Sequence, residues 1–512
     1  MLSFTFLVYL LTVRAYVWPS PQLEALDGLR FGMASHDDGG LSVFMQPCDT
    51  FFFANGTGRS GRANAADWVR TAYHDMATHD MAAGTGGLDA SIRFEEEQAR
   101  VENAGDGFAN TLSVLAAAAN RYISIADSIA IGAITAIESC AGPQIAFRGG
   151  RIDALEPNAP GVPRPEQDLA SHIASFARQG FTQTEMIGLV ACGHTFGGVQ
   201  HAPFPDIVPE LNDPDNTESV AHFDSTFVRF DNNVATEYIA GTTQNPLVVG
   251  LNDTTNSDKR IFWERRFSDS PDFFASTCAT LLARMLDTVP SGVQLTEVVT
   301  PLPVKPSNLA IILAGDMLNV SVEIRFWNMS ADANRLVRVL WDDHTEATHN
   351  VTLDFLGVTS SSNGRYNAAW YGMNATLDAA AGIKSMRFAV DNKLEDQDGI
   401  GFPVQDGIIF SATSCATSNT SGRFDVAVRR GINPARVYLE SISVDNTSRP
   451  ILSETDVPRP SKPVAEDAAY YIWSLNITDS VGNDYSIGAE VGGIKFSTVD
   501  THALADFPAC SA

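Results

Sequence analysis

Residues 68–76 read WVRTAYHDM and place an arginine, a tyrosine, a histidine and an aspartate in one apolar stretch. If the stretch is helical, Arg70 and His74 project from one face, roughly 6 Å apart at Cβ. A neighbouring cation disfavours the protonated form of an imidazole, so His74 is expected to be neutral and able to accept a proton. Arg70 can then stabilise a developing negative oxygen. The stretch predicts a base beside an electrostatic clamp; a packed polar histidine next to a surface Asp75 is the alternative.

Composition limits the class of protein. The chain has 512 residues, 44% of them hydrophobic and 19% charged, which allows large cores and excludes a disordered protein. Two or three domains are expected at this length. The formal net charge of −27 repels nucleic acid and anionic membranes, so neither is an expected partner. The most apolar internal segment, IADSIAIGAITAI, is too short to span a bilayer and is expected to be a buried helix.

Several features predict a secreted, extracellular glycoprotein. Residues 1–15 contain a short apolar core followed by Val-Arg-Ala, which suits signal-peptidase cleavage after Ala15; a buried N-terminal anchor is the alternative. Six cysteines, an even number, agree with an oxidising compartment. Nine Asn-x-Ser/Thr sequons predict N-glycans, at Asn55, Asn252, Asn319, Asn328, Asn350, Asn374, Asn419, Asn446 and Asn476.

The two halves of the chain have different patterns. Between about residues 60 and 290, apolar residues recur at helical spacing, for example in PEQDLASHIASFARQGF and FTQTEMIGLVACG. Three prolines follow at positions 301, 303 and 306, and beyond them the pattern becomes alternating and rich in β-branched residues, as in VSVEIRFW and HNVTLDFLGV. We expect a mainly α domain at residues 16–298 and an all-β, sandwich-like domain of about seven strands at residues 299–512.

A second histidine lies in a motif of its own. In GLVACGHTFGG, His194 ends an apolar helix just before a glycine-rich turn. Taken alone, this pattern is typical of a histidine that interacts with the C-terminal end of the helix dipole.

Five motifs in order resemble a known family. They are RTAYHD (70–75), GGLDASI (86–92), GHTFGG (193–198), HFDSTFVRFD (222–231) and NSDKRIF (256–262). Together they resemble the haem peroxidases of the plant, fungal and bacterial superfamily, most closely the secreted fungal branch. The resemblance covers roughly residues 60–290 and not the β-rich half. It implies the mainly α haem-peroxidase fold and haem b as cofactor.

The resemblance also implies roles for individual residues. Arg70 and His74 correspond to the distal side of the haem, and His194 to the proximal iron ligand. In the family an asparagine, braced by a glutamate six residues earlier, holds the distal histidine at Nδ1 and leaves Nε2 as the base. Further implied residues are Asn103 and Glu97 for this pair, Asp258 as the hydrogen-bond acceptor of the proximal histidine, and Phe223 beside the proximal ring.

Calcium ligands and the first disulfide follow from the same resemblance, whereas the other two pairs are expected because Cys192 and Cys278 both lie on helices of the peroxidase half. Two Ca²⁺ ions are implied, and carboxylate, hydroxyl and carbonyl oxygens are the ligands that Ca²⁺ requires. The distal set is Asp75, Gly87, Asp89 and Ser91, and the proximal set is Thr195, Asp224, Thr226 and Asp231. Cys140 matches a family cysteine whose partner precedes the distal helix, which leaves Cys48; the remaining pairs expected are Cys192–Cys278 and Cys415–Cys510.

The implied activity is reduction of hydrogen peroxide coupled to one-electron oxidation of two donor molecules. The manganese-oxidising relatives carry acids at the places of Ala63, Asp67 and Phe196, and lignin-type relatives carry a surface tryptophan at the place of Leu189. Neither site is therefore expected, and a small donor such as a phenol remains. Tyr73, where phenylalanine or tryptophan is usual, is either a redox participant or a packed ring.

Two alternatives remain open. The peroxidase half could be a degenerate scaffold carrying a cell-wall or glycan-binding β domain. The β domain could instead shape donor access, which would make small phenols the wrong substrate class. The protein is expected to be a monomer without a transmembrane segment.

Overall fold

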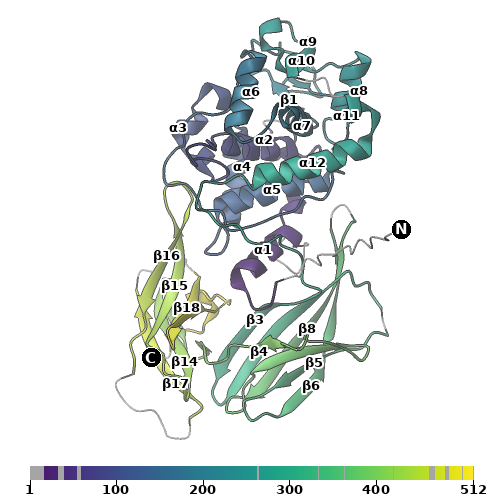
Figure 1. The fold of residues 1–512 in the computed structure, drawn as a ribbon. Coiled ribbons are helices and arrows are strands. Elements are labelled where there is room, and N and C mark those ends of the chain that lie inside the picture. Colours follow the sequence, from purple (N-terminus) through teal and green to yellow (C-terminus); the bar gives the residue numbers. More distant parts are fainter. Residues whose placement is uncertain are drawn as a thin grey trace, which may run out of the picture.

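A computed structural model describes residues 16–32, 40–54, 59–261, 265–332, 334–361, 364–418, 420–460, 468–478, 484–498 and 500–510. The predicted signal peptide, residues 1–15, lies outside these ranges, as do Asn55 and Asn419. Helices form the part of the molecule drawn at the top of Figure 1, and strands form the part below it. Within the described ranges, no helix combines the length and the apolar character needed to cross a membrane.

The first part of the chain folds into helices. The α-helices of the described residues are α1 (Pro21–Phe31), α2 (Asn64–Met76), α3 (Glu95–Gln98), α4 (Gly107–Leu115), α5 (Ile125–Ser139), α6 (Leu169–Arg178), α7 (Gln183–Gly193), α8 (Asn233–Ala240), α9 (Pro246–Val249), α10 (Ser257–Ile261), α11 (Arg265–Asp269) and α12 (Pro271–Leu286), with the short strands β1 (Gly198–Gln200) and β2 (Val220–His222) between α7 and α8.

The helical core is organised around α5, which is the buried helix that the sequence predicts. Almost every residue of α5 is buried, and Ser124 caps its first turn by accepting a hydrogen bond from the Asp127 amide. Helix α2 packs across α5 and buries Trp68 against it. Because α5 is apolar around most of its circumference, other helices can cover it on every face. Helix α2 packs on it with its apolar face, so the turn that carries Arg70 and His74 is directed away from this core.

The chain turns sharply between α6 and α7. Gly180 adopts a φ of +95° just beyond α6, the left-handed conformation that favours glycine at this position. Thr182 and Glu185 then form the predicted capping box at the start of α7. The local sequence thus fixes where α7 begins, and therefore where it ends, at His194.

The second part of the chain is made of strands. They are β3 (Val304–Ala314), β4 (Met317–Trp327), β5 (Val337–Asp342), β6 (Thr348–Thr352), β7 (Asp354–Ser360), β8 (Asn367–Asp378), β9 (Ser385–Val390), β10 (Lys393–Glu395), β11 (Phe402–Pro403), β12 (Ile408–Ser411), β13 (Cys415–Ser418), β14 (Ser421–Arg429), β15 (Arg436–Val444), β16 (Pro450–Asp456), β17 (Tyr470–Ile477), β18 (Tyr485–Val491) and β19 (Ile494–Ser497).

The expectation of about seven strands is wrong, because the described residues alone contain the seventeen from β3 to β19. Two causes can be named. The run HNVTLDFLGV divides at the buried Leu353 into β6 and β7, which pair in different sheets. In addition, β16 has no buried residue, so its sequence has no apolar alternation that would predict a strand.

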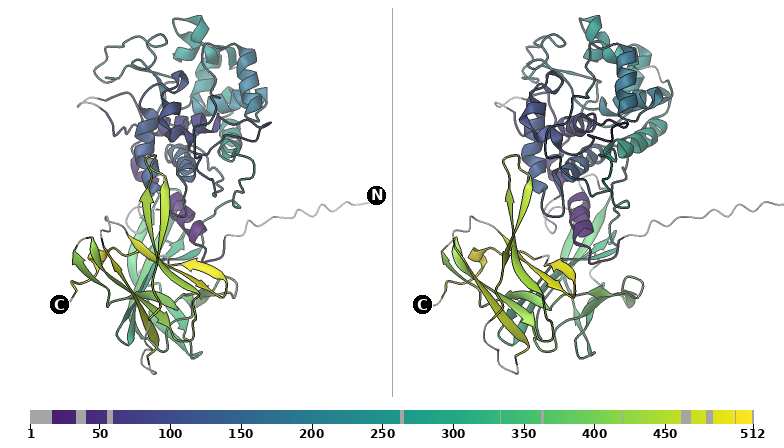
Figure 2. Two further views of the ribbon diagram at one scale, coloured as in Figure 1. Left: turned by 90° about the vertical axis from the view of Figure 1, so that its left-hand side faces the viewer. Right: turned by 60° about the vertical axis from the view of Figure 1, so that its left-hand side comes forward.

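One large sheet holds the strand-rich part together. It has eight strands, with β3, β4, β8 and β7 towards one end and β12, β13, β14 and β17 towards the other. The first group packs against the five-stranded sheet around β5 and β9, and the second against the four-stranded sheet around β15 and β18. The strand-rich part therefore has two hydrophobic cores that share one sheet. Figure 2 shows this part from the left-hand side of Figure 1.

The two parts of the chain are joined by buried polar contacts. Asp27 of α1 is fully buried, and its carboxylate lies 2.7 Å from Arg325 Nη1 and 3.4 Å from Lys305 Nζ. Arg121, between α4 and α5, bonds Glu440 of β15. The tip of the β15–β16 hairpin, which reaches up to the helices in Figure 1, bonds Arg93 through Thr447 at 3.3 Å.

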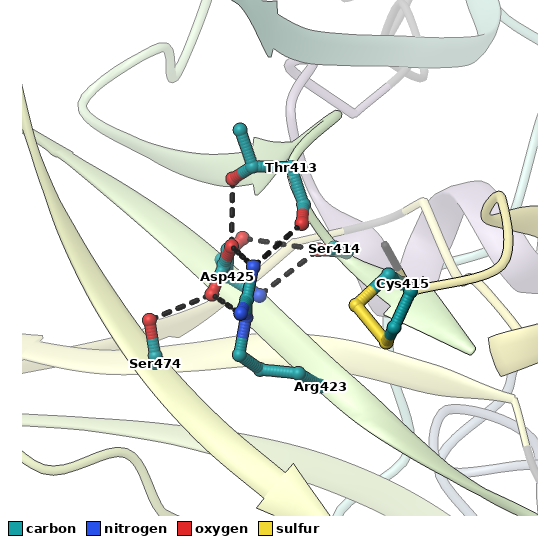
Figure 3. The surroundings of a disulfide bond; sticks show 7 residues. Thr413, Ser414, Cys415, Arg423, Asp425 and Ser474 are labelled. Carbon is teal, nitrogen blue, oxygen red and sulfur yellow. Dashed lines mark hydrogen bonds and ion pairs between the residues drawn. A yellow bond between two sulfur atoms is a disulfide. The ribbon is translucent and has the colours of Figure 1, made fainter. Parts of the chain in front are cut away.

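Three disulfides are present: Cys48–Cys140, Cys192–Cys278 and Cys415–Cys510, which are the expected pairs. The last closes the end of the strand-rich part. Figure 3 shows its surroundings, where the buried carboxylate of Asp425 accepts hydrogen bonds from the side chains of Thr413, Arg423 and Ser474.

The sequon asparagines that the structure describes are all exposed, as an attached glycan requires. They are Asn252, Asn319, Asn328, Asn350, Asn374, Asn446 and Asn476.

Candidate active site

A cavity of about 890 Å³ lies in the helical part and brings the two sequence motifs together. Arg70, Tyr73 and His74 line it from α2, and His194 lines it from the end of α7. The volume is within the range of small-molecule and cofactor sites. The lining is mainly apolar, with Phe176, Phe196 and Phe223 among its members. Two imidazoles from distant parts of the chain thus face one enclosed space.

His74 is held in one tautomer. Asn103 Oδ1 accepts a hydrogen bond from His74 Nδ1 at 2.7 Å, so the lone pair lies on Nε2. Asn103 is in turn oriented by Glu97, whose main-chain carbonyl accepts from Asn103 Nδ2 at 2.7 Å. Burial, together with the Arg70 cation, lowers the pKa of His74 to about 3. A neutral base at ordinary pH is the result.

Glu97 holds Asn103 through its main-chain carbonyl and not through its carboxylate. Its carbonyl holds Asn103, whereas its carboxylate accepts the main-chain N–H of Asn158 at 2.5 Å. Glu97 therefore ties the distal asparagine to the loop that carries Asn158.

Arg70 lies over an aromatic ring at the same end of the cavity. Its guanidinium carbon is 4.3 Å from the centre of the Phe108 ring, and Nη2 donates to the carbonyl of Ala104 at 3.2 Å. Burial lowers the pKa of Arg70 to about 10, so the side chain remains a cation at neutral pH. Its remaining donors are available for an oxygen atom in the cavity.

His194 is fixed by a buried carboxylate. Asp258 Oδ2 accepts from His194 Nδ1 at 2.8 Å, and Asp258 is 1% exposed. Phe223 stacks on the imidazole at 4.2 Å between ring centres. The same carboxylate oxygen accepts from Asn245 Nδ2 at 2.8 Å. The tautomer of His194 therefore has its lone pair on Nε2, as a metal ligand requires.

Asn245 is the residue that sequence reasoning missed. Its only local signal is its place before Pro246, where it caps α9 by accepting from the Leu247 amide. That signal indicates a helix start but does not predict that Asn245 Nδ2 donates a hydrogen bond to Asp258.

Tyr73 packs against α6. Its ring stacks on Phe176 with 5.9 Å between centres, and burial raises the pKa of its hydroxyl. The ring thus has the surroundings of a packed aromatic, while it also lines the cavity.

The predicted distal calcium ligands lie together around Asp75. Its carboxylate accepts from the amides of Asp89, Ala90 and Ile92, at 2.7–2.9 Å, and burial beside Asp89 raises its pKa. Ser91 Oγ lies 3.4 Å from the same carboxylate. Asn158 Nδ2 is within 3.3 Å of four oxygens, those of Asp89 (two), Ser91 and Thr78, although an amide has only two hydrogens to donate. Gly87 belongs to the same region, where its amide donates a hydrogen bond to Thr78 Oγ1.

The predicted proximal set also lies together. Thr195 Oγ1 donates to the Asp231 carbonyl at 2.8 Å, and Thr226 Oγ1 is 3.0 Å from the Asp231 carboxylate and 3.3 Å from that of Asp224. Burial, and secondarily the neighbouring Asp231, raises the pKa of Asp224 to about 7. In the described ranges, no group of three or more His, Cys, Asp or Glu side chains is placed to hold a metal.

The place of the manganese ligands is occupied by an ion-pair cluster. Asp67 Oδ2 lies 2.8 Å from Arg62, which also contacts Asp106 at 2.8 Å and Glu218 at 3.2 Å. Leu189, at the place of the surface tryptophan, is buried.

Comparison with known proteins agrees with this geometry. Residues 53–276 match the model of the peroxidase family. A WSC domain-containing protein of Arthroderma benhamiae is 35% identical over 389 residues, 73% of this chain and 52% of that protein. L-ascorbate peroxidase 5, peroxisomal, of Arabidopsis thaliana is 31% identical over 36% of this chain and 61% of the relative. A putative heme-binding peroxidase of Aspergillus fumigatus is 31% identical over 25% of this chain and 42% of that protein.

The chain spans about two fifths to three fifths of the length of these relatives. The alignment with the Arthroderma benhamiae protein is longer than the peroxidase match, so that likeness continues outside residues 53–276. The helical part with its paired imidazoles and the family match have the same location in the chain. Residues 53–276 therefore form a peroxidase domain, and a strand-rich region follows it.

Proposed function

We propose that this protein is a haem peroxidase that reduces hydrogen peroxide and oxidises small organic donors, phenols among them, in one-electron steps. The single observation that supports it best is the pair of cavity-lining imidazoles, His74 and His194, each bonded at Nδ1. The donor set suits haem b: His194 Nε2 would hold the iron, and Asp258 would strengthen that nitrogen as a donor. When bound, haem supplies the redox chemistry.

The protein's own residues handle the proton and the charge. His74 Nε2 takes a proton from one oxygen of hydrogen peroxide and delivers it to the other, which leaves as water. Arg70, buried beside it, stabilises negative charge on the leaving oxygen, and this stabilisation is large because water is excluded. Asn103 keeps the lone pair of His74 on the cavity side throughout.

The donor is organic in this proposal. At the manganese position only one of the three matching residues, Asp67, is an acid, and its carboxylate is already bound by Arg62 at 2.8 Å. A hydrophobic cavity wall with a few polar groups suits an aromatic donor better than a hydrated cation.

Purified protein reconstituted with haem tests the enzyme against the alternative of an inactive scaffold. Mixing with hydrogen peroxide in a stopped-flow instrument should change the Soret band of the wild-type protein within milliseconds to seconds. His74→Leu should slow this reaction by roughly 10²–10⁴-fold, because a general base is lost. Arg70→Leu should also slow it. Unchanged rates in both variants would contradict the proposal.

Two Ca²⁺ ions complete the proposed protein. In the distal set, more oxygen atoms surround Asn158 than its two amide hydrogens can bond. A cluster of oxygens with too few hydrogen-bond donors is an environment that a hard cation such as Ca²⁺ favours. Metal analysis of the dialysed protein should give about two calcium ions per chain, as in the ligand sets assigned above. Removing them with a chelator should lower the thermal midpoint. A calcium-free protein of unchanged midpoint would refute this part.

Secretion is proposed from the N-terminal sequence and the exposed sequons. Mature protein from the natural source should begin at Tyr16 and lose mass on treatment with an N-glycosidase. A protein that retains residues 1–15 and carries no glycan would contradict it.

A further inference from the structure

The cavity of the peroxidase domain has a third imidazole on its wall. His172 of α6 is 4% exposed and lines the cavity together with Phe176, one turn further along the helix. None of the roles assigned above uses it. Phe176 contacts Tyr73 of α2, and α6 also packs against α7 and α10, so His172 sits on a wall that runs between the two catalytic helices.

The lone pair of His172 can be placed from one hydrogen bond. Its Nδ1 lies 2.9 Å from the carbonyl oxygen of Asp168, one helical turn earlier. A carbonyl oxygen only accepts, so Nδ1 carries the hydrogen and the lone pair of the neutral ring lies on Nε2. Because Nδ1 faces the backbone of its own helix, Nε2 is the nitrogen on the opposite side of the ring. His172 therefore offers the cavity a hydrogen-bond acceptor that is also a base.

Part of the cavity wall just before α6 is exposed to solvent, as are Val101 and Asp206 on other parts of the wall. Arg164 and Glu166 line the cavity and are also exposed, with 44% and 41% of their side chains accessible, and they pair with each other at 3.1 Å. Pro163 and Pro165 line the same edge. Residues 162–166 therefore form a mouth with two rigid apolar rings and two charged side chains.

A second wall faces this mouth and is pinned to it. Asn252 and Thr255 line the cavity from the segment before α10, and Ser257 lines it from the first residue of α10. Arg260 joins the two walls, since its guanidinium donates to the carbonyls of Pro165 and Gln167 and to those of Asp253 and Thr254, at 2.5–3.2 Å. The spacing between the walls is thus set by hydrogen bonds to main chain and does not depend on loop packing alone.

We infer that the compartment between residues 162–166, α6 and residues 252–257 binds an organic donor that carries a hydroxyl group, with His172 Nε2 accepting the hydroxyl proton. The inference rests on the proposed function and names the site where its donor binds. When a phenol is oxidised, its O–H bond breaks: a bound haem would supply the oxidising power of hydrogen peroxide and take up the electron, and the proton would form an N–H bond at His172 Nε2. The phenoxyl radical leaves through the mouth, and His172 returns its proton to solvent there.

A binding measurement on the resting haem-loaded protein tests the inference without turnover. The probes are catechol and 1,2-dimethoxybenzene, which have the same ring and differ in whether the oxygens carry hydrogen. His172→Leu should weaken catechol binding roughly two- to tenfold, the worth of one hydrogen bond, and leave the affinity for 1,2-dimethoxybenzene unchanged. Isothermal titration calorimetry gives both dissociation constants.

A second variant separates hydrogen bonding from proton transfer. His172→Gln keeps an acceptor oxygen but cannot take up a proton at neutral pH. It should retain catechol binding while its rate of catechol oxidation at saturating hydrogen peroxide falls at least tenfold. The matched control is His201→Leu, since His201 likewise has Nδ1 at a backbone carbonyl, that of Val208 at 2.7 Å, but is not on the cavity wall. This control variant should leave catechol binding and the stopped-flow reaction with hydrogen peroxide unchanged.

The outcomes separate the two proposals. Equal catechol affinity in wild type and His172→Leu would overturn the inference, as would an equal loss of affinity for both probes, because the histidine would then only fill space. A wild-type protein that fails to react with hydrogen peroxide would refute the proposed function, whereas the binding comparison would still decide whether His172 contacts the donor.

Discussion

Replacing Asp27 by asparagine should weaken the attachment of α1 to the strand-rich part. The Asp27 carboxylate is fully buried, lies 2.7 and 3.0 Å from two nitrogens of Arg325, and accepts the Leu302 amide at 3.3 Å. Burial by itself raises the pKa of this group, but Arg325 and Lys305 outweigh burial, and the net effect lowers the pKa below its ordinary value of 3.8. The native state therefore holds an ionised carboxylate between two cations.

The magnitude follows from what asparagine leaves behind. The variant preserves the shape of the side chain but leaves Arg325 and Lys305, at 0% and 6% side-chain exposure, without their anion. Losing one partner of a buried ion pair costs about 3–5 kcal/mol. Since 1 kcal/mol moves the midpoint of a 150–250-residue domain by about 2–4 °C, the thermal midpoint should fall by roughly 6–20 °C.

Differential scanning calorimetry measures this effect. Asp253→Asn is the matched control, because Asp253 pairs with Lys259 at 2.9 Å on the open surface and its change should leave the midpoint where it was. The pKa of Asp27 is lower in the folded protein, so the stabilisation is present above about pH 4 and is lost as the pH falls below that value. The difference between wild type and variant should shrink correspondingly at pH 3. A midpoint within 2 °C of wild type at pH 7 would refute the reasoning.

Three further variants and one pH profile test the site and the strand-rich part. Asn103→Ala frees the His74 ring to rotate and change tautomer, and should slow the stopped-flow reaction with hydrogen peroxide by roughly 10–100-fold. The pKa of His74, about 3, keeps the base form dominant above that value, so the same rate should be flat from pH 7 to pH 4 and fall towards pH 3; a fall centred near pH 6.5 would contradict the assigned environment. Asp258→Asn removes negative charge behind the proximal ring and should raise the reduction potential of the bound iron in a spectroelectrochemical titration, and an unchanged potential would deny Asp258 that role. Replacing Cys415 and Cys510 by serine should lower stability by about 2–5 kcal/mol in urea unfolding and leave the peroxide rate intact.

The sequence predicts the residues of the site better than it predicts how they are held. Arg70 and His74 are four apart on one helix, so a single local pattern places both. His194 and Asp258 belong to recognisable motifs, and the structure joins them at 2.8 Å. Asn245 has no such motif, because its hydrogen bond to Asp258 is made by the tertiary fold and its local sequence only marks a helix start.

The β-strand character of the second half was predicted correctly, but the number of strands was predicted wrongly. Alternation identifies β5, whose Val337, Val339 and Trp341 all point into a core. It fails for β16, which has no buried residue and pairs with β15. The sharing of one sheet between two cores is also beyond local pattern, since β12 pairs in parallel with β3 from nearly a hundred residues earlier.

The placement of Trp18 has a consequence for the order of events during synthesis. Its ring lies in a core of the strand-rich part, 5.9 Å from Phe402, and its main chain exchanges hydrogen bonds with the side chain of Gln397. These partners are 379 residues apart, so at typical translation speeds roughly 20–75 s separate their emergence from the ribosome. By the end of that interval the residues of the helical domain are complete, while Trp18 is still without its partners in the strand-rich part. The first described residues of this protein are therefore among the last to reach their native contacts.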